Sequence, residues 1–244
     1  MPVGLVAVAF DADDPARLAA FWAAVLDRRT VDELNGALLP GDATQVGLRF
    51  IAAATEKSDR NRLHLHLTSS TLEDQQHTVE TVLDLGGRHL DIGQRPEEGH
   101  VVMSDPGGNE FCVIGPGNNF LAGCGILGEV SCDGSRDVGL FWRDALGWPL
   151  VWDQNEETAI QSPRGGTKIS WDTWPKPTPT EARRGGPTSA PQHQTRRQRF
   201  DLIAPDLAAE VERLVKLGAT EVGDRPTGAE LADPDGNEFT VSPA

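Results

Sequence analysis

The 244-residue sequence has little of several things, and each shortage argues against a class of protein. Its three cysteines, Cys112, Cys124 and Cys132, contain no CxxC spacing and are odd in number, which argues against a disulfide framework. Apolar runs such as residues 3–10 are far too short to span a bilayer, and no basic segment followed by an apolar one opens the chain. We therefore expect a cytoplasmic protein with reduced thiols.

Basic residues are also scarce. Lys and Arg number 22 against 37 Asp and Glu, which gives a formal net charge of −15. A surface this acidic repels the phosphates of nucleic acids and anionic lipid headgroups alike. We expect no nucleic acid partner and no membrane partner, but a small-molecule ligand bound by a monomer or a weak homodimer.

What the sequence does contain is an internal repeat. Residues 105–113 (DPGGNEFCV) recur as residues 233–241 (DPDGNEFTV), and three further matches keep the same order in both halves. These pairs are Phe21-Trp22 with Phe141-Trp142, residues 62–67 with 197–202, and residues 85–87 with 217–219. The repeat predicts one module at 1–118 and a second at 123–244. The second carries an inserted Pro- and Arg-rich segment at about 174–197, which we interpret as a linker or a lid.

Each half reads as strand, helix, strands, helix, strands. Helices are predicted after Asp13 or Asp14, after a capping box of Ser70 with Glu73, and in the second half near Ser135 and Asp206. Their apolar stripes include both Phe-Trp pairs, which we assign to the core. In the helix predicted to follow Ser70, the inward-facing apolar residues are expected to be Leu72, Val79, Val82 and Leu83.

Polar residues alternate with apolar ones on two of the predicted strands. Residues 63–67 alternate leucine with histidine, so His64 and His66 share one face. Each Asp-Pro-x-Gly-Asn turn leads into a similar strand, which puts Glu110 and Cys112 on one face, opposite Phe111.

The order of elements, the two Asp-Pro-x-Gly-Asn turns and the Asn61-Arg62-Leu63-His64-Leu65 strand resemble the vicinal oxygen chelate superfamily. That superfamily includes glyoxalases, bleomycin-resistance proteins and extradiol dioxygenases, and the glyoxalase-like branch is the closer match. The resemblance covers both halves. It implies an α+β fold of two tandem βαβββ modules, whose curled mixed sheets form cup-shaped cavities for small ligands.

The resemblance also implies where a metal would bind. The corresponding positions are Ala7, His64 and Cys112 in the first half, and Leu127, Arg199 and Thr240 in the second. Metal-dependent members of the superfamily use His, Gln or Glu at these positions, and only His64 is of that kind, so we expect no metal cofactor. An alternative is a non-standard site for Zn, Ni, Fe or Mn at His64, His66 and Glu110.

Eight residues are candidates for contact with a ligand. They are His64, His66, Glu110, Cys112, Trp171, Arg199, Asp201 and Glu238. Glu110 and His66 are the candidates for general acid–base catalysis. Glu110 and Glu238 alternatively fasten the turns before them, and Cys112 is a possible nucleophile with a histidine as its base.

Three functions are compatible with these residues. The first is a metal-independent protein that binds a small apolar or aromatic molecule in a cup, as the drug-binding members do. The second is a metal-dependent lyase, isomerase or dioxygenase that uses His64, His66 and Glu110. The third is a metal-free catalyst with Glu110 or a histidine as general base. Whether the protein is an enzyme stays open, and we expect the working site in the first half.

Overall fold

The computed structural model describes residues 3–53, 60–91, 93, 98–173, 197–225 and 227–244. The insertion expected at about 174–197 lies outside these residues, apart from Arg197.

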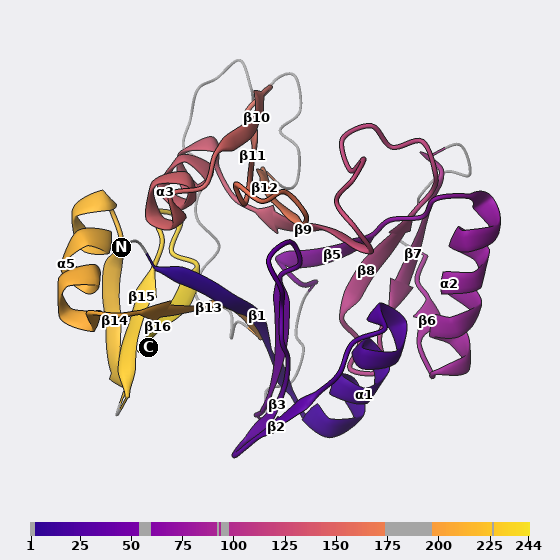
Figure 1. Ribbon diagram of the computed structural model, residues 1–244, viewed down its shortest axis with the longest axis horizontal. Helices are drawn as coiled ribbons and strands as arrows, with labels where there is room; N and C mark the ends of the chain where they lie inside the picture. Colours follow the sequence, from indigo (N-terminus) through magenta and orange to yellow (C-terminus); the bar gives the residue numbers. More distant parts are fainter. Residues whose placement is uncertain (1–2, 54–59, 92, 94–97, 174–196, 226) are drawn as a thin grey trace.

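Four βαβββ motifs follow one another along the chain, two in each half (Figure 1). The first comprises β1 (Gly4–Ala12), α1 (Pro15–Leu26), β2 (Val31–Glu33), β3 (Gly36–Leu39) and β4 (Gly47–Ala52). The second comprises β5 (Leu63–Leu67), α2 (Leu72–Asp84), β6 (Arg88–His89), β7 (His100–Ser104) and β8 (Glu110–Ile114).

The second half repeats this plan. The third motif comprises β9 (Leu127–Asp133), α3 (Arg136–Leu146), β10 (Leu150–Gln154), β11 (Glu157–Gln161) and β12 (Lys168–Asp172). The fourth comprises β13 (Gln198–Ala204), α5 (Leu207–Leu217), β14 (Thr220–Arg225), β15 (Gly228–Ala232) and β16 (Glu238–Pro243). The α+β class and the tandem repeat are confirmed, and each half holds the βαβββ motif twice rather than once.

Two eight-stranded mixed sheets combine strands from both halves. Sheet A has the order β14-β15-β16-β13-β1-β4-β3-β2, and sheet B has the order β10-β11-β12-β9-β5-β8-β7-β6. The halves meet in each sheet through one antiparallel ladder, β1 with β13 and β5 with β9. Sheet A thus joins the first and fourth motifs, while sheet B joins the second and third.

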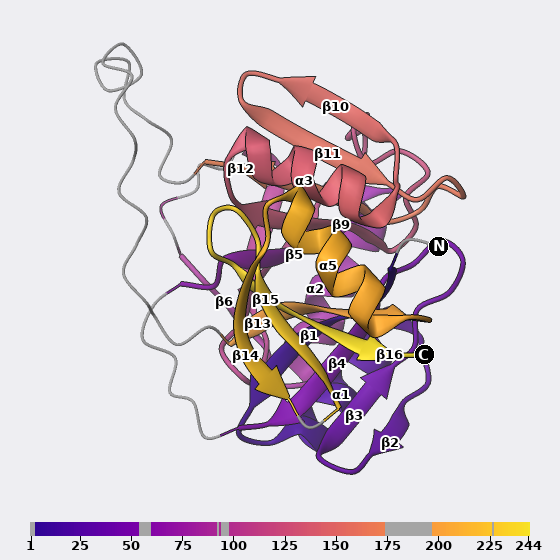
Figure 2. The ribbon, with the colours of Figure 1, turned by 90° about the vertical axis from the view of Figure 1, so that its left-hand side faces the viewer.

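The helices of each half gather on opposite sides of the molecule, α1 with α2 and α3 with α5 (Figures 1 and 2). Each half has its own aromatic core beneath them. Trp22 of α1 packs on Phe111 of β8 with ring centroids 4.9 Å apart, and Trp142 of α3 packs on Phe200 and Phe239 at the same distance. The assignment of both Phe-Trp pairs to the core is confirmed, since all four side chains are buried.

The Asp-Pro-x-Gly-Asn turns are hydrogen-bonded to the tryptophans of these cores. Asp105 is completely buried and accepts hydrogen bonds from the Gly107 and Asn109 backbone amides, and from the Trp22 indole at 3.0 Å. Gly108 supplies the positive φ of 78° that the turn requires. The second turn repeats the arrangement, with Asp233 bonded to the Trp142 indole at 3.2 Å.

Two details of the α2 prediction are wrong. Thr71, not Ser70, is the N-cap, and its hydroxyl accepts from the Asp74 amide while the Ser70 amide donates to Asp74. The capping box is therefore shifted by one residue. Leu72 and Leu83 are exposed at 72% and 39%, because the buried stripe of α2 runs through Gln75 and Val82.

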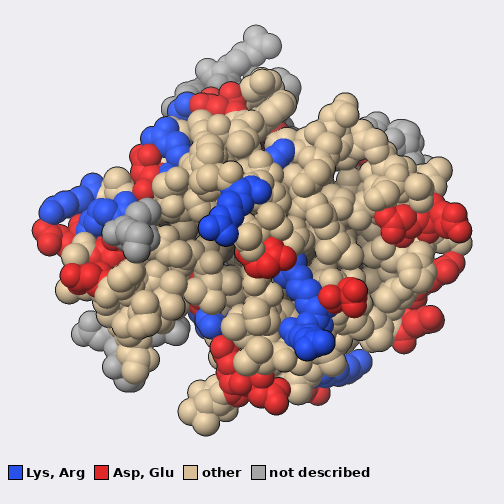
Figure 3. Space-filling model, viewed as in Figure 1, with Lys and Arg blue, Asp and Glu red and all other residues tan. Residues whose placement is uncertain are grey.

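The negative charge is unevenly spread. Four acidic residues and no Lys or Arg lie on α2, and acidic side chains gather over that helix at the right-hand edge of Figure 3. None of the helices in the described ranges has the length and apolar character needed to cross a membrane.

Candidate functional site

Each sheet has one face buried in the cores and an opposite face that carries polar side chains. On β5, Leu63, Leu65 and Leu67 are buried while His64 and His66 are half-buried on the other side. The predicted alternation of this strand is confirmed. We call the side of sheet B that carries His64 and His66 its polar face.

The structure divides the eight candidate residues among three places. His64, His66, Glu110 and Cys112 lie together on the polar face of sheet B. Arg199, Asp201 and Glu238 lie in sheet A. Trp171 is 1% exposed and lies on the helix-facing side of sheet B, where its ring borders Gly139 of α3.

One row of side chains crosses three neighbouring strands of this polar face. His66 is paired with Cys112 of β8 on one side and with Glu129 of β9 on the other. The imidazole Nδ1 of His66 donates to Glu129 Oε2 at 2.6 Å, and Ser170 Oγ donates to Glu129 Oε1 at 2.5 Å. We call Cys112, His66 and Glu129 the histidine row.

The row holds a buried charge pair. Burial disfavours the charged form of His66, but hydrogen bonds with Cys112 and Glu129 outweigh it and raise the pKa of His66 to about 10. Burial likewise opposes the charge on Glu129, yet the bonds from His66 and Ser170 hold its pKa below the usual value. At neutral pH the pair is therefore imidazolium and carboxylate.

His64 lies two residues away and has the opposite protonation state. Burial, with added repulsion from the positive charges of His66 and Arg60, lowers the pKa of His64, so its imidazole is neutral at neutral pH. Its Nε2 atom is buried and has no hydrogen-bond partner among the described residues. An unpaired buried nitrogen of this kind is costly unless water or a ligand contacts it.

Glu110 fastens the start of β5. Its Oε2 accepts from the Asn61 backbone amide at 3.2 Å, while the Asn61 side chain bonds Asn109 of the adjacent turn. This contact matches the structural alternative for Glu110, in which the carboxylate secures the loop beside it.

Glu129 is the site residue that the sequence analysis missed. Ala7 is paired with Asp201, and Glu129 with His66; because Asp201 and His66 are equivalent in the repeat, Glu129 is the counterpart of Ala7. The assignment of Leu127 to that role is wrong. The register shift between Leu127 and Glu129 in β9 matches the shift between Leu5 and Ala7 in β1, so Leu127 is the counterpart of Leu5. The one available signal was a glutamate between two apolar residues, Leu127 and Val130, of a predicted strand, because glutamate is rarely buried without a partner.

Sheet A carries arginines where sheet B carries smaller or uncharged groups. Arg49 of β4 contacts Asp201 at 2.6 Å and Glu33 at 2.9 Å. Arg199, the counterpart of His64, contacts Asp11 at 2.8 Å. Thr240, the counterpart of Cys112, donates to Asp201 at 2.5 Å. These ion pairs leave the equivalent face of sheet A without a histidine row.

Within the described residues, sheet B shows no group of side chains arranged as a metal site. Among the described residues no three His, Cys, Asp or Glu side chains are placed to hold one. His66 and Glu129 are hydrogen-bonded at 2.6 Å, whereas two ligands of a tetrahedral zinc ion lie about 3.3 Å apart.

A second row on the polar face joins His64 to an aromatic pair. Register pairs His64 with Ser131, Ser131 with Ser170, Ser170 with Ala159, and Ala159 with Trp152. Trp152 meets Phe120 edge to face, with ring centroids 5.8 Å apart. We call this set the serine row, because two half-buried serines separate the histidine from the tryptophan.

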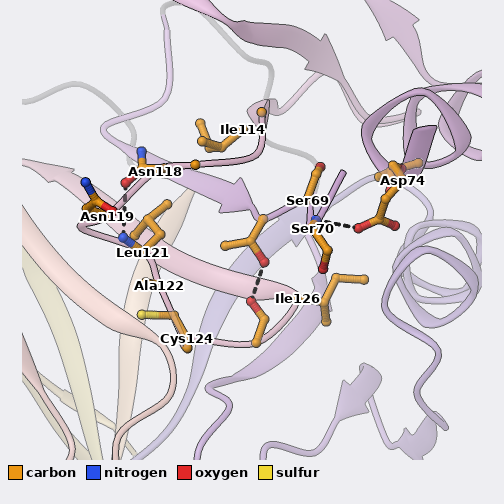
Figure 4. Close-up of a pocket in the computed structure, with 16 residues that line it drawn as sticks. Ser69, Ser70, Asp74, Ile114, Asn118, Asn119, Leu121, Ala122, Cys124 and Ile126 are labelled. Atoms are coloured by element: carbon orange, nitrogen blue, oxygen red, sulfur yellow. Dashed lines mark hydrogen bonds between the residues drawn. The ribbon is translucent and has the colours of Figure 1, made fainter. Parts of the chain in front are cut away.

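A pocket of about 550 Å³ adjoins this face at the end of β5 (Figure 4). Thr68 and Ile114 line it: Thr68 directly follows the end of β5, and Ile114 is the last residue of β8. Ser69, Ser70 and Asp74 line one side and Asn118 and Asn119 the other, as Figure 4 shows. The pocket is thus mainly polar and borders the histidine row.

Comparison with known proteins agrees with this architecture. A family model described as glyoxalase-like domain matches residues 7–114 and again residues 129–242. Glyoxalase I from Zea mays is similar in structure, with a TM-score of 0.65 and 16% identity over 99% of this chain and 92% of that chain. A "putative dioxygenase" from Bacillus subtilis subsp. subtilis str. 168 has a TM-score of 0.54 and 14% identity over 99% and 85%. A search of curated proteins found no match.

The fold and its paired sheets define a two-module protein of the vicinal oxygen chelate superfamily. Within it, the chain belongs to the glyoxalase-like domain family, which matches both halves. At such low identities the two structural neighbours establish the fold alone.

Proposed function

We propose that the protein binds a small, largely apolar or aromatic molecule on the polar face of sheet B, without a metal ion. The observation that carries the proposal is the buried His64 Nε2 without a partner, which a hydrogen-bonding group of a ligand would satisfy. In the same serine row, Ser131 and Ser170 are small, and Trp152 with Phe120 offers an aromatic surface.

Charge favours a neutral ligand. The imidazolium of His66 is balanced by Glu129 at 2.6 Å, so neither charge calls for a counter-ion from the ligand. The matching face of sheet A is occupied by the ion pairs of Arg49 and Arg199, which supports a single working site.

A second candidate function is metal-free acid–base catalysis at the same place. His64 is neutral and can accept a proton, while His66 is charged and can donate one. Neighbouring groups whose environments push their pKa values apart are typical of acid–base pairs.

Quenching of tryptophan fluorescence tests ligand binding, because Trp152 is 36% exposed while Trp22, Trp142 and Trp171 are each 1% exposed. A screen of neutral aromatic compounds should find a ligand that quenches the native protein. His64→Ala should weaken its binding about tenfold, the effect of one lost hydrogen bond. Ser131→Leu should block binding by filling the serine row.

His77→Ala is the matched control, since His77 is exposed on α2 and should not affect binding. Binding that EDTA abolishes and that Zn, Ni, Fe or Mn restores would contradict the proposal. So would a stoichiometric metal, found by elemental analysis, that is lost on His64→Ala.

A further inference from the structure

The three cysteines occupy different surroundings. Cys124 and Cys132 are buried at 1% and 4% exposure, and burial raises the pKa of both thiols. Cys112 is half-buried on the polar face of sheet B, at the end of the histidine row. Only Cys112 among them is placed beside an imidazole.

We propose that Cys112 is a nucleophile that adds to small α,β-unsaturated carbonyl compounds, with His66 as its proton partner and Glu129 as a positioning residue. The three residues occupy one row on adjacent strands β8, β5 and β9, which are fixed in register. Glu129 holds the His66 ring at 2.6 Å, and Ser170 in turn holds Glu129 at 2.5 Å. A nucleophile, a base and a group that orients the base form the usual arrangement for thiol catalysis.

The step needs no other reactant. The Cys112 thiolate forms a bond from sulfur to the β-carbon of the alkene, while the π electrons of the C=C bond move to the α-carbon. That carbon takes the proton of the His66 imidazolium, which leaves a thioether and a neutral imidazole. A cation beside a thiol favours the thiolate, the reactive form.

The substrate class follows from the surroundings of the row. The pocket of about 550 Å³ is lined by Thr68 and Ile114, which follow His66 and Cys112 by two residues. Cys112 itself does not line the pocket, whereas the buried Cys124 does. Amide and hydroxyl groups of Asn118, Asn119 and Ser70 line it and can bond a carbonyl oxygen. An uncharged electrophile suits this site, because Asp74 also lines the pocket and would repel an anion.

This inference rests on the proposed function in placing the ligand on the polar face of sheet B. The two can nevertheless fail separately. Cys112 of the native protein could prove unreactive while the Cys112→Ser variant still binds ligands that quench tryptophan fluorescence. That result would overturn the role of Cys112 as a nucleophile and leave the proposed function standing.

Alkylation of the native protein tests the proposal. The intact chain is treated with limiting N-ethylmaleimide, an α,β-unsaturated imide, and the modified peptides are measured over time by mass spectrometry. Cys112 should react first, and Cys124 and Cys132 serve as internal controls. His66→Gln should slow the modification of Cys112 at least about tenfold, whereas His77→Gln should leave it unchanged.

Glu129→Gln distinguishes positioning from simple exposure. The charged or titratable groups around His66 are Glu129 on β9, Lys168 on β12, Cys112 on β8 and His64 on β5 itself. Loss of the carboxylate weakens the imidazolium, so Cys112 should be alkylated more slowly at neutral pH while access to the thiol stays the same.

A rate of Cys112 modification that is unchanged in both His66→Gln and Glu129→Gln would overturn the proposal, since exposure alone would then explain the reaction. Circular dichroism checks that each variant folds. If His66→Gln is unfolded, Ser170→Ala is used in its place, because this substitution removes the hydrogen bond to one Glu129 oxygen and keeps the contact of Glu129 with His66. Cys112 should then be modified more slowly in Ser170→Ala than in the native protein. An unchanged rate would overturn the proposal.

Discussion

His64 and His66 lie two residues apart on one strand and hold opposite charge states. Both are half-buried, so burial alone does not separate them. The difference comes from the hydrogen bonds of His66 with Cys112 and with Glu129, whose carboxylate lies 2.6 Å from His66 Nδ1, while His64 Nε2 has no partner within the described residues. Neighbours on the two adjacent strands thus decide which histidine carries the proton.

This pairing predicts how stability depends on pH. His66 keeps its proton up to a pKa of about 10 in the folded protein, against about 6.5 when unfolded, so its stabilising effect is complete below about pH 6.5 and is lost as the pH rises toward 10. Between pH 7 and 9 the free energy of unfolding of the native protein should fall, relative to His66→Gln, by up to about 1.4 kcal/mol per pH unit. Urea unfolding at several pH values measures this, and parallel curves for the two proteins would contradict it.

At the scale of elements, each half is held together by a helix tryptophan that bonds a turn aspartate. Trp22 and Trp142 lie on α1 and α3, while Asp105 and Asp233 lie in the turns that precede β8 and β16. The bond connects the first helix of each half to its last hairpin. The turn therefore anchors the helix as well as connecting two strands.

Replacing either tryptophan by phenylalanine should be destabilising. Trp22→Phe keeps an aromatic ring against Phe111 but removes the indole donor to a buried carboxylate, for an expected loss of about 2 kcal/mol. Trp142→Phe should cost a similar amount. Trp152→Phe, at a 36% exposed position, should change the free energy of unfolding by less than about 0.5 kcal/mol. Urea denaturation compares the three variants, and equal losses in the free energy of unfolding would refute the anchoring role of the two Trp–Asp hydrogen bonds.

Elements of this kind could be predicted from the sequence because their signals are local. Asp14, one of the two residues predicted for its helix, and Asp206 are N-caps, and Gly108 and Gly236 take the positive φ that the turns require. The pairing of His66 with Glu129 could not be predicted, because it depends on a register shift in β9 that moves the side chain onto the polar face. Such irregularities arise from packing against other strands, which no local pattern records.

On the scale of the whole molecule, the two halves are interlocked. The ladder of β1 with β13 contains six residue pairs, and that of β5 with β9 contains five. The sequence repeat predicted two equivalent halves but could not reveal that each sheet takes one motif from each. Strand pairing between distant segments depends on edges that meet only in the folded protein.

The boundaries at 1–118 and 123–244 can be tested by separating the halves. Expressed together as two chains with different tags, they should copurify in equal amounts, because both antiparallel ladders cross between them. Each half expressed alone leaves the edges of β1 and β5, or of β9 and β13, without their partners, and should aggregate or associate with itself. A soluble, folded monomer of either half, seen by size-exclusion chromatography and circular dichroism, would contradict this.

The interlocking also sets an order of events during synthesis. Sheet B uses the continuous stretch from β5 to β12, whereas sheet A needs strands from both ends of the chain. Ala7 meets Asp201 only after 194 further residues have been added, a wait of about 10–40 s on a ribosome that adds about 5–20 residues per second. Throughout that time β1, one of the most apolar strands, lacks the partner strand on the edge that pairs with β13. β1 is made long before the strand that covers this edge, so the yield of folded protein should depend on how soon β13 follows.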